Sequence, residues 1–330
     1  MRIAVLGAGA MGGTLAALLD RAGHDLEVTA RGPGLAAIRE HGIRLSGAWG
    51  EHTARVRAGE VLTRRPELAI VATKAMDAAA AVRTSAEHLH GTPVVVVQNG
   101  LGGLEAVAAE LPGTPVIGAL SLIAATYRSP GEVVVTTPAG TWLGVTSGDA
   151  GSAHAVASVL ADAVPVTVVE GFAGARWTKL MINQLNALPA ITGLSVQEVI
   201  DHDGLRRIMA LSMREAARIA LASDVRFEEV MGVTHSMLVG IGEGDAAHAE
   251  TLPLLLRAYL GDVPNPGSTL QSIRRGQPSE IDYLNGAVVA AARELGLDAP
   301  LNARLTELVH EVERTGRFLS TTETLAALKC

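Results

Sequence analysis

The spacing of apolar residues changes near residue 170 and predicts two kinds of structure. Before that point, the apolar runs at residues 2–6, 68–73 and 94–97 are short. Such runs, hydrophobic on both faces, are typical of parallel strands covered by helices. Beyond it, Leu, Ile, Val, Met and Ala recur at helical spacing. These helical runs cover residues 203–222, 227–240, 246–260, 280–295 and 302–314.

The pattern therefore predicts an α/β fold with two domains. Residues 1–170 are expected to form a domain with a mostly parallel sheet, and residues 171–330 an all-helical domain. A length of 330 residues favours the same division, because it exceeds what one hydrophobic core usually supports. Further apolar runs are expected to extend the sheet, partly in antiparallel pairing. They lie at residues 116–125, 131–137, 141–145 and 166–170.

A glycine-rich turn follows the first strand directly, and an apolar helix follows the turn. In dinucleotide-binding domains, the first glycine of G-x-G-x-x-G permits a tight turn and the second lets the backbone approach a pyrophosphate. The third lets helix and strand pack closely, and the helix N-terminus attracts the anion. The order strand, turn, helix predicts a Rossmann-type cofactor site rather than a chance glycine-rich turn. The turn consists of Gly7, Ala8, Gly9, Ala10, Met11 and Gly12.

Arg31 ends the second expected strand, residues 26–30. NAD-binding domains place an acidic residue near this point to hold the ribose 2′-hydroxyl. A guanidinium there instead suits the 2′-phosphate of NADP. The sequence favours NADPH over NADH, and the alternative is a solvated arginine at a strand end.

Polar residues also follow two later strands. Lys74 comes after the run at residues 68–73, and Asn99 follows the run at residues 94–97. In open parallel sheets, ligands collect outside the carboxyl ends of the strands. Each residue alone could equally be an ordinary loop residue, but together they are candidates for ligand binding.

A polar stripe marks the first helix expected in the second domain, from residue 175 onward. Lys179, Asn183 and Asn186 are spaced i, i+4 and i+7, which places them within roughly 60° of arc on an α-helix. Buried amines and amides need hydrogen-bond partners, so the stripe faces either water or a polar cleft. Beside a cofactor domain, we expect it to face a ligand cleft.

Glu280 follows Ser279 and precedes Asp282. Ser279 and Asp282 form a capping signature, which places Glu280 in the first turn of a helix. The helix dipole favours an acid at that position whatever its function. The functional alternative is that Glu280 faces the substrate.

Together these motifs resemble the ketopantoate reductase (2-dehydropantoate 2-reductase) family. The resemblance covers nearly the whole chain in order and includes Lys74 after Ala72 and Thr73. It implies a Rossmann domain, a helical domain and NADPH-dependent reduction of ketopantoate to pantoate in pantothenate and coenzyme A biosynthesis. The further segments that carry it are the glycine turn, Gln98-Asn-Gly100, Arg176-Trp177 with Lys179-Leu-Met-Ile-Asn183, and Ser279-Glu-Ile-Asp282 with Asn285.

The resemblance also implies roles for individual residues. Lys179 and Glu280 correspond to the catalytic residues of the family. Arg31, Lys74 and Asn99 would serve the NADPH end of the site together with the glycine turn. The residues that would bind substrate are Asn99, Asn183, Asn186 and Ser268.

Two departures from the family pattern concern the substrate. Asn186 follows Asn183 by three residues, where the family usually has four. Ser272 replaces the acid of the family's Ser-x-x-Gln-Asp pattern that starts at Ser268. Alternatives are therefore a paralogous NADPH-dependent ketone or imine reductase with another substrate, and a non-catalytic NADP-binding protein.

A lysine suits the expected chemistry. Hydride transfer to a ketone builds negative charge on the oxygen, and an ammonium can donate a proton there. Arg176, three residues before Lys179, is expected to lower the pKa of Lys179, because like charges disfavour each other. Glu280, if close, would oppose that shift.

The composition limits the cellular setting. A net charge of −7 without a basic block argues against nucleic acid as a partner. The single cysteine, Cys330, excludes an intramolecular disulfide and indicates a reducing compartment. Because the chain shows no signal peptide and no membrane-spanning run, we expect a cytoplasmic protein. No metal site is expected, and the apolar helices of the second domain could form a homodimer.

Overall fold

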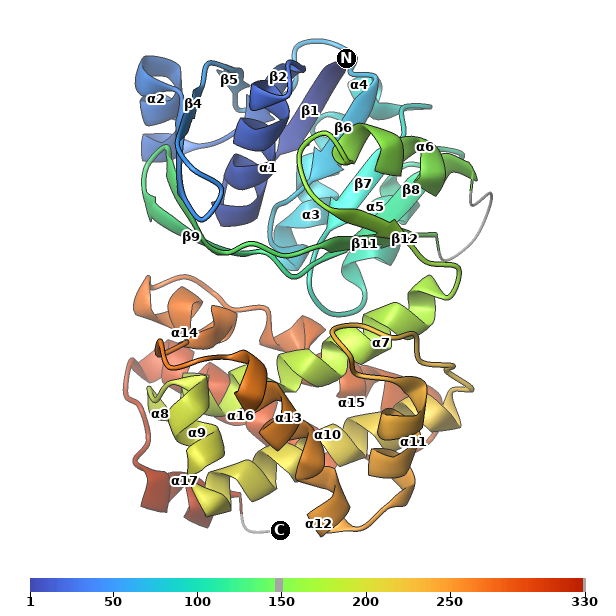
Figure 1. The fold of residues 1–330 in the computed structure, drawn as a ribbon, viewed down its shortest axis with the longest axis vertical. Coiled ribbons are helices and arrows are strands. Elements are labelled where there is room, and N and C mark those ends of the chain that lie inside the picture. The colour runs from blue at the N-terminus through green and yellow to red at the C-terminus, as the bar shows by residue number, and fades with distance from the viewer. Residues whose placement is uncertain (146–150, 329–330) are drawn as a thin grey trace. The chain divides into compact units, whose positions relative to one another are not determined.

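The computed structural model describes residues 1–145 and 151–328 (Figure 1). Cys330 lies outside these ranges. The chain divides into two compact units. The first contains residues Met1–Gln98 and Gly102–Phe172, and the second contains Asn99–Leu101 and Ala173–Cys330. Each unit is described by itself below.

The first unit is built on an eight-stranded sheet in the order β12-β11-β8-β7-β6-β1-β2-β5. All neighbouring strands are parallel except β8 and β11, which are antiparallel. The predicted α/β class with a mostly parallel sheet is confirmed. The strands are β1 (Arg2–Leu6), β2 (Asp25–Thr29), β5 (Arg57–Gly59), β6 (Leu68–Val71), β7 (Val94–Val97), β8 (Val116–Ser121), β11 (Thr141–Gly144) and β12 (Val166–Val168).

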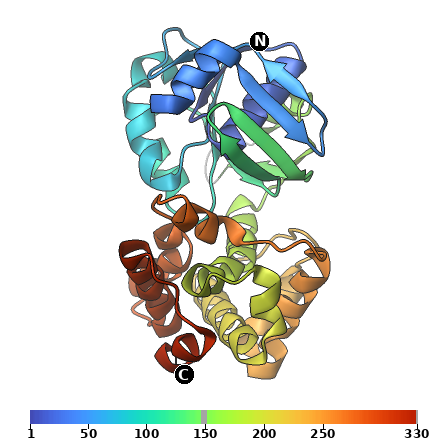
Figure 2. The ribbon, with the colours of Figure 1, turned by 90° about the vertical axis from the view of Figure 1, so that its left-hand side faces the viewer.

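A second, four-stranded sheet in the order β4-β3-β10-β9 belongs to the same unit. Its strands are β3 (Ile43–Gly47), β4 (His52–Ala54), β9 (Ala124–Ser129) and β10 (Glu132–Thr137). Figure 2 shows the green β9–β10 hairpin beside the blue strands β3 and β4. The expectation that residues 116–125 and 131–137 both extend the main sheet was therefore wrong. The first run splits into β8 and β9, and β9 pairs only with β10.

The helix α1 (Ala10–Arg21) carries the core of this unit between the two sheets. Leu15, Leu18 and Leu19 are buried with apolar residues of β1 and β2, such as Val5 and Val28. Residues of the second sheet belong to the same cluster. The other helices are α2 (Gly32–His41), α3 (Ala75–Arg83), α4 (Ala86–Leu89), α5 (Gly103–Glu110) and α6 (Gly151–Leu160).

Helices alone make up the regular structure of the second unit, apart from one isolated bridge between Val230 and Val233 within its described residues. The first predicted helix is α7 (Phe172–Asn183), and the longest is α10 (Asp203–Ala222), at the predicted residues. The others are η1 (Gln184–Asn186), α8 (Ala187–Thr192), α9 (Val196–Asp201), α11 (His235–Glu243), α12 (Ala246–Ala249), α13 (Thr251–Tyr259), α14 (Gly267–Arg274), η2 (Ile281–Tyr283), α15 (Asn285–Glu294), α16 (Pro300–Thr315) and α17 (Thr321–Ala327).

Three of the predicted helical ranges include residues that are not α-helical in the structure. Residues 227–234 are not helical, and the bridge between Val230 and Val233 closes a tight turn in which Met231 has a φ of 54°. The predicted helix at residues 246–260 breaks before Thr251, close to Pro253, whose missing N–H interrupts helical hydrogen bonding. The helix expected from residue 280 begins only at Asn285, after the short helix η2.

Within the described ranges, no helix is long and apolar enough to cross a membrane.

Candidate active site

The glycine turn joins β1 to α1 in a conformation that glycine makes possible. Gly7 has a φ of +96°, and an added Cβ there would overlap Thr73. An added Cβ at Gly12 would overlap the carbonyl oxygen of Gly7. Gly9 differs, because no atom lies within 4 Å of where its Cβ would be. The turn and the N-terminus of α1 therefore leave open space beside Gly9.

Hydrogen bonds tie this turn to the end of β2. The N–H groups of Gly7 and Ala8 donate to the carbonyl oxygen of Thr29 at 3.2 and 3.1 Å. The Thr29 hydroxyl also accepts from Gly7 at 3.1 Å. Arg31 follows two residues later as the exposed N-cap of α2. The glycine turn and Arg31 thus lie at the ends of two neighbouring parallel strands.

Lys74 lies at the end of the next strand of the sheet, β6, which pairs with the other side of β1. It is the N-cap of α3 and is partly buried. Gln98, after β7, donates from its amide nitrogen to the Thr73 carbonyl oxygen at 3.2 Å. The glycine turn, Arg31 and Lys74 thus follow the carboxyl ends of β1, β2 and β6, three neighbouring strands of one sheet.

Lys179 lies on α7, the helix labelled in Figure 1. Within residues 1–145 and 151–328, its ammonium makes no hydrogen bond or ion pair. Desolvation by burial lowers its pKa to about 8, although the residue keeps some exposed surface. The expected cause was the neighbouring Arg176, but burial is the only cause of this shift. An amine with a pKa near 8 can give and take a proton close to neutral pH.

Asn183 ends α7 and is buried. Its amide nitrogen donates a long hydrogen bond of 3.5 Å to the side-chain oxygen of Asn99. Asn99 belongs to the short segment Asn99–Leu101 of the helical unit. The structure thus brings together two residues that were each proposed to bind substrate.

The same segment also contacts the residues that follow Glu280. The N–H of Leu101 donates to the Tyr283 carbonyl oxygen at 3.0 Å. Gly100 has a φ of +79°, and an added Cβ would overlap that carbonyl group. Residues 99–101 therefore connect the end of α7 to the η2 turn, which places Asn99, Asn183 and the turn with Glu280 in one region of this unit.

Asn186 has a different position from the one that the helical stripe predicts. The α-helix ends at Asn183, and Asn186 lies in the 3₁₀-helix η1. Its amide nitrogen donates to the Asn183 carbonyl oxygen at 3.0 Å, and its oxygen accepts from the Ser268 N–H at 3.2 Å. Asn186 therefore uses both ends of its side chain to join η1 to α14.

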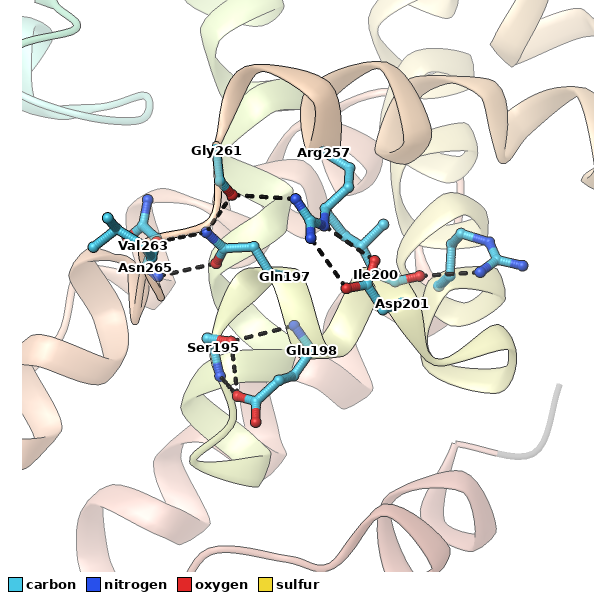
Figure 3. A network of polar contacts seen from close by, with 10 residues as sticks. Ser195, Gln197, Glu198, Ile200, Asp201, Arg257, Gly261, Val263 and Asn265 are labelled. Atoms are coloured by element: carbon cyan, nitrogen blue, oxygen red, sulfur yellow. Dashed lines mark hydrogen bonds and ion pairs between the residues drawn. The ribbon is translucent and has the colours of Figure 1, made fainter.

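Ser268 is an exposed residue in the first turn of α14. Gln197 of α9 fixes the loop that precedes it (Figure 3). The Gln197 amide donates to the carbonyl oxygens of Gly261 and Val263 at 3.3 and 2.7 Å, and accepts from the Asn265 N–H at 2.9 Å. Gln197 of α9 thus holds the loop before Ser268, and Asn186 binds the Ser268 N–H directly.

Glu280 precedes η2 and is not in the first turn of an α-helix as expected. The Ser279 hydroxyl accepts from the Ile281 N–H at 3.3 Å, so it caps only this short turn. The residues on either side of Glu280 are held by α16. Glu313 accepts from the Ser279 N–H at 2.7 Å, and His310 contacts Asp282 at 2.9 Å.

A chain of buried amides supports both η1 and the start of α15. The amide nitrogen of Asn285 donates to Gln184 at 2.6 Å and to Asn302 at 2.9 Å. The Asn302 amide donates in turn to Glu215 of α10 at 2.7 Å. Sequence reasoning named Asn285 within a motif but missed Gln184, Asn302 and Glu215, because a single buried polar residue has no spacing pattern. Gln184 and Asn285 are adjacent in sequence to Asn183 and to the η2 turn, so the network links the two parts of the candidate site.

Family models match both units of the chain. Residues 3–148 match the model described as ketopantoate reductase PanE/ApbA. Residues 172–313 match the model of the C-terminal part, ketopantoate reductase PanE/ApbA C terminal. The chain belongs to the ketopantoate reductase family. The resemblance drawn from the sequence is confirmed, and so is the prediction of an oxidoreductase of this family.

Individual relatives agree along nearly their whole length. The chain is 28% identical to the 2-dehydropantoate 2-reductase of Pyrococcus horikoshii over 96% of this chain and 99% of that protein. It is 29% identical to the 2-dehydropantoate 2-reductase of Mesorhizobium japonicum over 90% of this chain and 91% of that protein.

Solved structures show the same fold. The PanE/ApbA family ketopantoate reductase from Ralstonia eutropha superposes with a TM-score of 0.79 at 28% identity, covering 95% of this chain and 99% of that one. A D-mandelate dehydrogenase crystallised with NADH and anilino(oxo)acetate has a TM-score of 0.81 at 22% identity, covering 97% and 100% of the two chains. At that identity, the second likeness concerns the fold alone.

Proposed function

We propose that this chain reduces a 2-keto acid to the 2-hydroxy acid with NADPH, with 2-dehydropantoate as the substrate and pantoate as the product. The observation that carries the proposal is Lys179. It is a lysine with a pKa of about 8 in the same unit as Asn183, Asn99 and the turn with Glu280. The name 2-dehydropantoate 2-reductase, shared by relatives that cover nearly the whole chain, supports this choice of substrate.

The glycine turn and Arg31 fit a nicotinamide dinucleotide. Open space beside Gly9 and the N-terminus of α1 suits a pyrophosphate, because backbone N–H groups and the helix dipole attract anions. Arg31 lies exposed at the end of β2, where its guanidinium would pair with a 2′-phosphate. These features support NADPH over NADH, with Lys74 and Asn99 at the neighbouring strand ends as further contacts.

When bound, the cofactor supplies a hydride to the carbonyl carbon. The protein's part is to neutralise the charge that develops on the carbonyl oxygen. At pH 7, an amine with a pKa near 8 is about nine-tenths protonated, so the Lys179 ammonium can donate a proton to that oxygen. Glu280 would orient the ammonium or the substrate hydroxyl.

The amides would recognise the substrate. Asn183 and Asn99 can each donate to a carboxylate or accept from a hydroxyl, and the exposed hydroxyl of Ser268 can do the same. Asn186 is assigned a different part, because both ends of its side chain are already bonded within the protein. It would place Ser268 and the end of α7 rather than contact the substrate.

The position of Asn186, three residues after Asn183 instead of four, supports a second candidate function. This is a paralogous ketone or imine reductase with another substrate. The third candidate is a non-catalytic NADP-binding protein. That function would not require the lowered pKa of Lys179.

We also propose that the protein is a cytoplasmic homodimer, on the basis of its composition and its apolar helices.

The test is to follow NADPH oxidation with a panel of 2-keto acids, 2-dehydropantoate included, and with cyclic imines. The proposal expects the highest kcat/KM with 2-dehydropantoate. A preference for another keto acid or an imine would select the paralogue. Tight NADPH binding without oxidation by any member of the panel would support the binding protein.

A further inference from the structure

We infer that His310 and Glu313 are positioning residues that hold the turn with Glu280 in its working conformation. The inference rests on the role proposed for Glu280. It concerns two residues of α16 that lie far from Glu280 in sequence and outside every motif named above. Their contacts involve the residues immediately around Glu280.

The two residues act on the turn from both sides. Glu313 accepts the N–H of Ser279, the residue before Glu280, at 2.7 Å. His310 contacts Asp282, two residues after Glu280, through Nε2 at 2.9 Å. The other ring nitrogen, Nδ1, contacts Glu313 at 2.9 Å. One imidazole therefore bridges Asp282, which lies in the turn, and Glu313, which holds Ser279, and we call this arrangement the His310 bridge.

Its geometry requires a protonated imidazole. An ionised carboxylate only accepts hydrogen bonds, and a neutral imidazole has one N–H. With carboxylates at both nitrogens, only the imidazolium donates to both. Loss of one proton therefore costs either the contact with Asp282 or the contact with Glu313.

The charges around His310 favour the imidazolium. Burial alone would lower the pKa of His310, but the hydrogen bonds and charges of Asp282 and Glu313 outweigh it and raise the pKa above 6.5. Among the described residues, Asp282 from η2 and Glu313 from α16 itself are the charged groups that cause the shift. The helices α8, α10 and α15, which also pack on α16, contribute none.

The sign of the pH effect follows from this shift. A group whose pKa is raised in the folded protein stabilises its contacts fully at low pH and loses them as pH rises through the raised value. The His310 bridge is therefore complete at low pH and opens as the pH rises through the raised pKa of His310. Opening would free Asp282, the more exposed partner, and loosen the turn with Glu280.

Substitution of His310 should not unfold the protein, because its side chain is 43% exposed. The test compares H310A, which removes the bridge, with H310R, which keeps a positive charge and several donors at every pH. H41Q is the matched control, since His41 forms an exposed pair with Glu40 in the other unit. For each full-length variant, kcat and KM are measured with NADPH and the best keto acid from pH 5.5 to 9, together with the melting temperature. E280Q is measured alongside.

H310A is expected to lower kcat by about twofold to fivefold at low pH, the range that exposed ion pairs support. The ratio of wild-type to H310A kcat should fall towards one as pH rises, because the wild type loses the bridge there. H310R should keep wild-type kcat at low pH and exceed the wild type at higher pH, and H41Q should match the wild type throughout. The fall in kcat that follows from Lys179 near pH 8 is common to all variants and cancels in the ratio.

A ratio of one at every pH for H310A, with E280Q strongly impaired, would overturn the inference and leave the proposed function intact. A constant ratio above one would assign His310 a purely structural part and overturn the inference as well. Full activity of E280Q would instead remove the proposed role of Glu280, on which the inference depends.

Discussion

The glycine turn of the first unit and the polar region of the second unit are fixed in different ways. At the turn, neighbouring backbone atoms determine the conformation, as shown by the close approach of Gly12 to the Gly7 carbonyl. In the helical unit, long-range side-chain bonds determine it. Asn186 bonds to Ser268 across 82 residues, and Asn285 bonds to Gln184 across 101. The first kind of site can be recognised in a short motif, whereas the second depends on the whole helical fold.

The largest effect is expected from the helical unit. K179A should lower kcat at least about a hundredfold, the usual scale for a lost general acid, and leave the Kd of NADPH nearly unchanged. K179R keeps the charge and should also be impaired, because a guanidinium does not give up its proton at neutral pH. Steady-state kinetics measure kcat of both variants, and titration measures their Kd for NADPH. Near-normal turnover of K179A would end the assignment.

The glycine turn offers a matched pair. G9A should weaken NADPH binding about tenfold or more, because a methyl group would occupy the space proposed for the pyrophosphate. Its stability should fall by less than about 1 kcal/mol, since the added Cβ meets no protein atom. G12A should instead lose about 1–3 kcal/mol of stability by overlap with the backbone. Fluorescence titration and thermal unfolding separate the two, and unchanged NADPH affinity in G9A would contradict the cofactor site.

Arg31 tests the cofactor choice within the same unit. R31A should weaken NADPH by about tenfold, since a charge-assisted bond to the 2′-phosphate is lost. NADH, which lacks that phosphate, should bind R31A and the wild type alike. Parallel titrations with both cofactors measure this, and equal losses for both would remove the argument for NADPH.

The smallest expected effects come from substitution of Asn186 and Asn183, which should differ in their effects on stability and on KM. N186A should cost about 1–3 kcal/mol of stability, because it removes two hydrogen bonds of the buried Asn186 side chain. N183A loses only one long bond to Asn99 and should stay nearly as stable, but it should raise KM for the keto acid severalfold. Thermal unfolding and steady-state kinetics are measured on both. A raised KM in N186A with unchanged stability would reverse these roles.

The sequence predicts best where the pattern is local. The strand, turn and helix around Gly7–Gly12 and the 20-residue helix α10 could both be identified from spacing. The second sheet could not, because β3 pairs with β10 about 90 residues later. Its strand β10 was recognised as a strand but expected in the main sheet, and β3 and β4 contain no apolar run that marks them as strands.

The same limit applies to the candidate site. The helical stripe correctly places Lys179 and Asn183 on α7, but α7 ends at Asn183 and Asn186 lies in η1. Both ends of the Asn186 side chain are bonded there within the protein, to the Asn183 carbonyl oxygen and the Ser268 N–H. The hydrogen bond to Ser268 that favours this ending lies outside any local window. The late start of α15 has a similar cause, because α16 holds Ser279 and Asp282.

The most direct test is the pH dependence of kcat/KM for the keto acid at saturating NADPH. If Lys179 donates the proton with a pKa of about 8, kcat/KM should be level below pH 7 and fall about tenfold per pH unit well above pH 8. A profile that stays flat from pH 7 to about pH 9.5 would contradict the claim that Lys179 supplies the proton.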